Sequence, residues 1–70
     1  MNVRYSKHAI VDSMPDESIS KAEVEACIRK AELRTKISGK KFKFRYRDLE
    51  VVCVKTDACW YVVTCYRLNQ

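Results

Sequence analysis

The only histidine of the chain, His8, is its one side chain that ordinarily changes charge near neutral pH. The imidazole has a reference pKa of about 6.5, which suits either proton-transfer role in metal-free cleavage of RNA. Such cleavage also needs cations beside the phosphate, and guanidinium groups bind phosphate through paired donors. The candidate catalytic residues are His8, Arg47, Arg67 and Tyr66.

Aromatic and basic residues alternate in the second half of the chain, most clearly between Phe42 and Arg47. Aromatic rings interleaved with cations are typical of surfaces that bind single-stranded RNA, because the rings stack on bases and the cations follow the backbone. The candidate RNA-binding residues are Lys41, Lys43, Arg45 and Trp60.

Each of these residues also has a structural explanation. His8 lies four positions before Asp12, so the two can form a pair on a helix surface. Arg45 and Arg47, on the wet face of a strand, can simply discourage pairing at a sheet edge. Trp60 and Tyr66 are large enough to be core residues with a polar tip.

The charge of the chain is unevenly distributed. Its 70 residues carry a net charge of +5, and nine Lys or Arg but only one acid, Glu32, lie between Arg29 and Arg47. Acidic residues gather instead from Asp12 to Glu25. This segregation favours RNA, the ribosome or an acidic protein as a partner, although a basic surface can also serve solubility alone.

Several classes of protein are disfavoured by composition. The chain has no apolar run of the roughly 18–20 residues that cross a bilayer, and no apolar leader, so we expect no membrane association and a cytoplasmic location. Its four cysteines contain no CxxC pair, which favours buried reduced thiols over a metal site. A single glycine leaves no phosphate-binding loop, and we expect no cofactor.

Two helices are expected in the first half of the single domain, residues 1–70. Ser6 is a candidate N-cap for a helix from Lys7 to Met14, with Ile10, Val11 and Met14 turned inward. Ser20 and Glu23 form a capping box before a second helix. That helix repeats apolar residues in one stripe: Val24, Cys27, Ile28 and Ala31.

Strands are expected in the second half. Residues 33–37 and 42–46 alternate in polarity, and residues 50–55 and 59–67 are β-rich and apolar on both faces, which suits the sheet centre. The sequence therefore predicts an α+β domain in helix-helix-strand-strand-strand order. Its two N-terminal helices pack on a three- or four-stranded antiparallel sheet.

The motifs of residues 5–67 resemble those of a small family of unknown function that is grouped with the RelE/BrnT-type toxin-like fold. They fall on Ser6, His8 and Ala9, on Ser20 with Glu23, and on Val63, Thr64 and Tyr66. The resemblance implies a domain whose active relatives cleave RNA, often on the ribosome, without metal or cofactor, and are neutralised by an antitoxin. This chain is shorter than the better-known toxins. It carries Asp12, Ser13 and Met14 where the family commonly has an arginine.

Three functions follow as hypotheses. The first is a toxin-like RNA-binding module that acts as a metal-independent ribonuclease. The second is a non-catalytic interaction module, in which a basic strand edge from Phe42 to Arg47 captures an acidic partner. The third is a redox or metal domain. A sheet that is apolar on both faces leaves dimerisation open.

Overall fold

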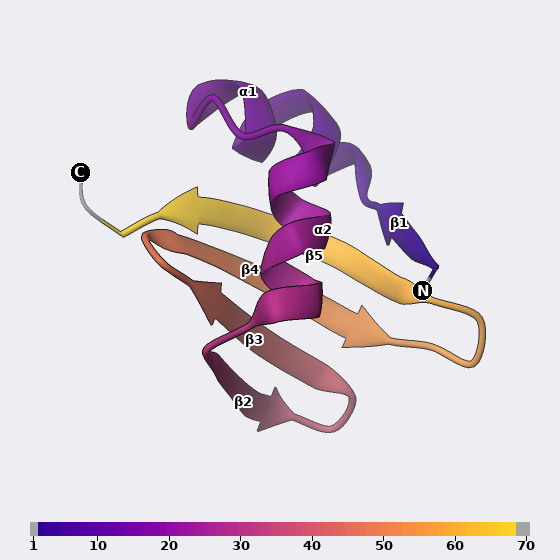
Figure 1. Ribbon diagram of the computed structural model, residues 1–70. Coiled ribbons are helices and arrows are strands. Elements are labelled where there is room, and N and C mark those ends of the chain that lie inside the picture. Colours follow the sequence, from indigo (N-terminus) through magenta and orange to yellow (C-terminus); the bar gives the residue numbers. More distant parts are fainter. Residues whose placement is uncertain (1, 69–70) are drawn as a thin grey trace.

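The computed structural model describes residues 2–68. One mixed sheet of five strands forms a layer, and three short helical segments lie along one of its faces and its β5 side (Figure 1). In chain order the elements are β1 (Val3–Tyr5), η1 (Ala9–Ser13), α1 (Met14–Asp16), α2 (Lys21–Lys30), β2 (Leu33–Ser38), β3 (Lys41–Tyr46), β4 (Leu49–Lys55) and β5 (Trp60–Arg67).

The strand order across the sheet is β1-β5-β4-β3-β2. Strands β2 to β5 form consecutive antiparallel hairpins, and β4 is the central strand, as its two apolar faces indicate. Strand β1 runs parallel to the start of β5, with Val3 aligned to Trp60 and Tyr5 to Val62. The Tyr5 hydroxyl donates to Glu25 Oε2 at 2.9 Å, which ties β1 to α2.

The predicted arrangement of helices and strands is wrong in two respects, although the chain is an α+β domain. A strand, β1, precedes the helices, and the sheet has five strands of mixed direction instead of three or four antiparallel ones. Strand β1 has only three residues, which is too short for a polarity pattern to be read. Its partner strand lies at the opposite end of the sequence, and local patterns contain no information on such pairing.

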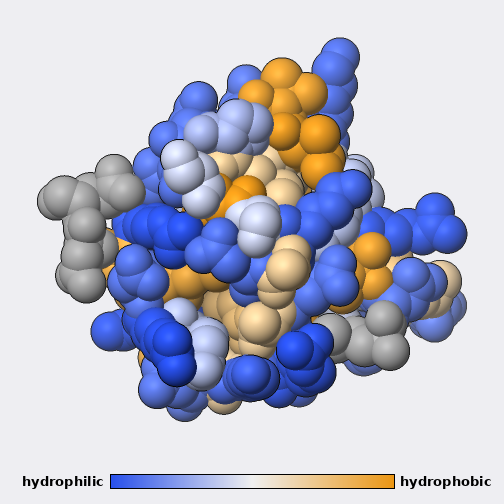
Figure 2. Space-filling model, turned by 45° about the horizontal axis from the view of Figure 1, so that its top comes forward, coloured by the Kyte–Doolittle hydropathy of each residue, from blue (hydrophilic) through white to orange (hydrophobic). Residues whose placement is uncertain are grey.

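The helical segment after β1 differs from a regular helix. The Ser6 hydroxyl accepts from the Ala9 amide at 3.0 Å, so Ser6 caps the segment as predicted. Residues 9–13 then form a π-helix, whose wider turn shifts the inward face. Met14 is buried as expected, but Ile10 and Val11 are 40% and 56% exposed. Figure 2 shows apolar patches among hydrophilic side chains on the face of the molecule that it views.

Helix α2 agrees with its sequence pattern. Ser20 and Glu23 exchange both hydrogen bonds of the capping box, which satisfies amides that a helix start otherwise leaves unpaired. Val24, Cys27 and Ile28 are buried against the sheet. Within residues 2–68, no helix is long and apolar enough to span a membrane.

The core lies between α2, η1 and the helix-side face of the sheet. Phe44 and Val51 are aligned across β3 and β4, and both are nearly inaccessible. The Cys27 thiol lies 3.6 Å from the Phe44 carbonyl oxygen, which places α2 directly over β3. The opposite face is here called the open face, because no helical segment of residues 2–68 covers it.

Candidate nucleic-acid interface

The open face brings together side chains from all five strands. Alternation along each strand turns every second residue to this face, and the register aligns these residues in rows across the sheet. One row runs from β1 to β3, and another runs from β5 to β2. The first row is Arg4, Tyr61, Val54 and Lys41, and the second is Tyr66, Glu50, Arg45 and Leu33.

A column of cations runs along β3 on the open face. Lys41, Lys43 and Arg45 occupy alternate positions of the strand, so the structure places these three candidate RNA-binding residues together. Successive members lie roughly 7 Å apart along the strand, given a rise of about 3.4 Å per residue. Lys41 and Arg45 are exposed, and neither forms an ion pair in the part of the chain that the structure describes.

The middle cation of the column, Lys43, is paired with a buried carboxylate. Lys43 Nζ lies 3.2 Å from Glu50 Oε1, and the Tyr66 hydroxyl donates to the same oxygen at 2.9 Å. Glu50 is only 5% exposed although it lies on the open face, because neighbouring side chains cover it. Burial and the bond to Glu50 raise the pKa of Tyr66, so its ring is fixed as a neutral donor.

Two tyrosines form an aromatic column on β5, beyond β4. Tyr61 is 39% exposed and is aligned with Arg4 of β1, so the two residues are neighbours across the paired strands. Tyr66 lies further along the same strand. Between the tyrosines and the cations, β4 contributes the apolar side chains of Val52 and Val54. The open face thus combines rings, cations and an apolar strip in one surface.

Trp60, the fourth candidate RNA-binding residue, lies on the helix-side face instead. Its ring meets Phe42 and Phe44 edge-on, with ring centroids 5.5 and 5.0 Å apart. The register of β4 with β5 shifts by one residue between Val52 and Cys53, a β-bulge that changes which side chains share a face. Trp60 and Tyr66 are an even number of positions apart, but the bulge places them on opposite faces.

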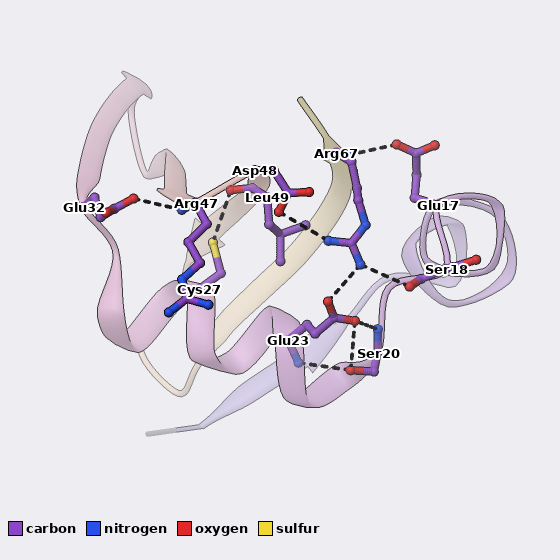
Figure 3. Close-up of polar contacts among 10 residues, drawn as sticks. All are labelled: Glu17, Ser18, Ser20, Glu23, Cys27, Glu32, Arg47, Asp48, Leu49 and Arg67. Atoms are coloured by element: carbon purple, nitrogen blue, oxygen red, sulfur yellow. Dashed lines mark hydrogen bonds and ion pairs between the residues drawn. The ribbon is translucent and has the colours of Figure 1, made fainter. Parts of the chain in front are cut away.

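Acidic residues surround the arginine at the end of β5, and its backbone amide donates to Glu17 Oε1 at 2.8 Å (Figure 3). The Arg67 guanidinium lies 2.8 Å from Glu23 Oε2 and 3.6 Å from Asp48 Oδ1, and it also donates to the Ser18 carbonyl oxygen. The bond from Arg67, together with the Ser20 amide, lowers the pKa of Glu23. Two carboxylates therefore already neutralise the Arg67 guanidinium, so little of its positive charge is left to attract a phosphate.

Arg47 lies close to Arg67, and both line a cavity of about 200 Å³. The Arg47 guanidinium lies over the Tyr46 ring at 5.1 Å, and its amide donates to Glu32 Oε1 at 2.8 Å. Its backbone φ of 58° is unusual for a residue with a side chain and reflects the tight turn between β3 and β4. The cavity is also lined by Glu23 and Asp48, so it carries no excess positive charge.

His8 does not line the cavity that Arg47 and Arg67 share. Its Nδ1 lies 3.2 Å from Asp12 Oδ2, which is the surface pair that the sequence spacing allows, and its side chain is 60% exposed. The helical segment of His8 lies along β5, whereas Arg45 is on β3, two strands further across the sheet. His8, Arg47, Arg67 and Tyr66 therefore do not converge on one place.

The thiols give no sign of a metal centre. Cys27, Cys53 and Cys65 are buried and free, as predicted, and Cys59 is partly exposed and free. Burial raises the pKa of Cys27 to about 11 and that of Cys53 to about 12, so both remain protonated at neutral pH. Among residues 2–68, no cluster of three or more His, Cys, Asp or Glu side chains is placed to bind a metal.

Two residues of the open face were missed as site residues: Arg4 and Glu50. Arg4 belongs to the strand that was not predicted. The bulge in β5 puts Tyr61 on the open face and Trp60 on the helix-side face, and the sequence alone does not show where the bulge lies. Because β1 has only three residues, Val3 to Tyr5, its polarity gave no usable signal for Arg4.

The chain matches no protein-family model, no curated protein and no solved structure. The resemblance to the RelE/BrnT-type toxin-like family therefore stays a prediction. A function for this protein is inferred from the placement of its described residues alone.

Proposed function

We propose that this protein binds single-stranded RNA across the open face of its sheet. The observation that carries the proposal is the parallel arrangement of two columns, the cations of β3 and the tyrosines of β5, on a face without helices. Surfaces that bind single strands combine a basic track for the phosphates with rings on which bases stack. The net charge of +5 provides long-range attraction for such a polyanion.

The toxin-like resemblance is compatible with RNA binding, but cleavage is not part of the proposal. A general base must lie within hydrogen-bond reach of the proton that it removes. His8 is paired with Asp12 and lies beyond β5 from the cation column. Arg67 is neutralised by Glu23 and Asp48. Binding is therefore the function that this arrangement supports best.

The test is the salt dependence of RNA affinity, measured by fluorescence anisotropy with a labelled single-stranded oligonucleotide. The double variant Lys41→Ala/Arg45→Ala removes two cations of the column. We expect affinity to fall at least tenfold, with the slope of log K against log salt shallower by about 1.4, because each lost phosphate contact changes it by about 0.7.

The matched control is Arg29→Ala/Lys30→Ala, which removes the same charge from the exposed end of α2 on the other side of the sheet. Tyr61→Ala tests stacking separately, and it should weaken binding by about 1–3 kcal/mol if a base stacks there. Equal losses in the open-face variant and in the control would reject the open face as the RNA site.

A further inference from the structure

The edge of the sheet suggests a second surface, distinct from the open face. Strand β2 is the outermost strand on one side, and all six of its residues are exposed. Strand β3, from which the interaction hypothesis took its basic edge at Phe42 to Arg47, is instead internal and pairs on both sides. Among residues 2–68 no strand pairs with the outer backbone groups of β2, and such an edge can accept another strand.

We propose that the edge of β2 binds an extended acidic segment of a partner protein, which adds to the sheet as a further strand. The proposal does not depend on RNA binding. In β-strand addition, the backbone bonds provide affinity and the alternate side chains provide specificity. The two sides of β2 therefore define the sequence pattern of the segment.

The side chains of β2 differ sharply between the two faces of the sheet. Arg34 and Lys36 align with Phe44 and Phe42 and so belong to the helix-side face. The open-face side of β2 carries Leu33, which is 49% exposed, and Thr35, because these two align with Arg45 and Lys43. Ile37, 47% exposed, lies at a bulge between Lys36 and Ser38. A strand docked beside β2 places its own side chains in the same alternation. Its acidic residues would therefore face the helix side and its apolar residues the open side.

The cation of Arg34 is held in place beside this edge. Its guanidinium lies over the rings of Phe42, Phe44 and Trp60, at 4.9, 5.6 and 5.1 Å from their centroids. In the described part of the chain neither Arg34 nor Lys36 forms an ion pair. The Arg34 charge is thus held in place but uncompensated, which is the state in which a carboxylate from a partner gains most.

A basic cavity continues the edge at the far end of β2. It has a volume of about 250 Å³ and lies above the Phe42 side chain. Its lining includes Lys36, Lys40 and Lys55 but only one carboxylate, that of Asp57. The excess positive charge there extends the same preference for an acidic partner beyond the strand itself.

A second copy of this chain suits the edge poorly. In an antiparallel pair of two β2 strands centred on Thr35, each Arg34 would stand opposite the Lys36 of the other copy. Like charges directly opposite on paired strands are destabilising. Cations at edge strands also protect proteins against self-association. The same charges that repel a second copy attract an acidic strand, so the partner is a different chain.

The test uses a synthetic peptide of alternating glutamate and valine, as long as β2, and a peptide of the same composition in which the glutamates are grouped at one end. Affinity is measured by titration calorimetry. We expect the alternating peptide to bind at least about tenfold more tightly, because only it places charges and apolar groups on the correct faces. Equal binding of both peptides would reduce the interaction to general charge attraction and overturn the proposal.

Variants locate the site. Lys36→Glu should weaken binding of the alternating peptide at least about tenfold, because it sets like charges opposite each other, whereas Lys7→Glu makes the same charge change on the exposed helical segment and should not. In amide NMR spectra, the largest shifts should fall on β2. Shifts centred on the open face, or a concentration-dependent dimer without peptide in sedimentation, would contradict docking of a partner strand at this edge.

Discussion

The two faces of the sheet consist of the same five strands, but only one of them is closed by helices. On the helix-side face, Phe44, Val51 and Val62 are almost completely buried. On the open face, Tyr61 is 39% exposed, and of the cations along β3 only Lys43 has a carboxylate partner among the described residues.

Charge compensation also differs between the end of β5, beside α2, and the cations along β3. Beside α2, Arg67 is surrounded by Glu23 and Asp48, which hold the end of β5 against the helix. On the open face, Lys41 and Arg45 are free of ion pairs among residues 2–68. The comparison teaches that most of the buried apolar contacts, which stabilise the fold, lie on the helix-side face. The side chains of the open face are therefore available for binding.

The largest expected effect is on the helix-side face. Phe44→Ala should lower the free energy of unfolding by about 3–5 kcal/mol, because it removes a buried ring that packs on Trp60 and leaves a cavity. The matched change on the open face, Tyr61→Ala, should stay within about 0.5 kcal/mol. Urea denaturation measures both. Similar losses in the two variants would break the distinction between the faces.

Alkaline titration sharpens the same distinction, because three of the thiols are buried on the helix side. Burial raises the pKa of Cys27 from 9.0 to about 11, so the unfolded chain releases this proton at lower pH than the folded protein. The contribution of Cys27 to stability is complete below pH 9.0 and is lost as pH rises through about 11. Its full size is about 3 kcal/mol, at about 1.4 kcal/mol per pKa unit.

Thermal denaturation over a series of pH values measures this decline. Cys27→Ala should be less stable at neutral pH but should lose less stability between pH 9 and 11 than the unchanged protein does. If Cys27→Ala loses as much stability between pH 9 and 11 as the unchanged protein does, then Cys27 is accessible to water and α2 does not exclude water from this face.

The smallest effect concerns the buried carboxylate of the open face. Glu50→Gln keeps an acceptor for the Tyr66 hydroxyl but removes the charge that attracts Lys43, so it should cost about 1 kcal/mol. Glu50→Ala should cost more, because Tyr66 also loses its acceptor. Chemical denaturation of both variants provides the comparison, and equal losses would mean that the Tyr66 bond contributes nothing.

Local sequence patterns predicted local structure well. The capping box of α2 and the alternation of β3 depend on residues a few positions apart, and both are present. The cation column of Lys41, Lys43 and Arg45 results from that alternation. These features are readable because their physical causes lie within one element.

The remainder depends on contacts between distant segments. The parallel pairing of β1 with β5 joins the two ends of the chain, and no local pattern specifies it. The bulge in β5 decides that Tyr61 joins Tyr66 on the open face and that Trp60 does not. A shift of one residue exchanges the faces of a strand, so a site built across strands cannot be assigned until the register is known.

The position of β1 also has a consequence for how the protein is made. Asn2 bonds to Ala58, which is 56 positions away, and Ser6 bonds to Val62 and Val63 of β5. On the ribosome, β1 is synthesised long before β5, so it must remain unpaired until nearly the whole sheet has left the exit tunnel. Contacts between such distant positions slow folding. The hairpins from β2 to β5 can therefore assemble first, and β1, although translated before them, is the last strand to join the sheet.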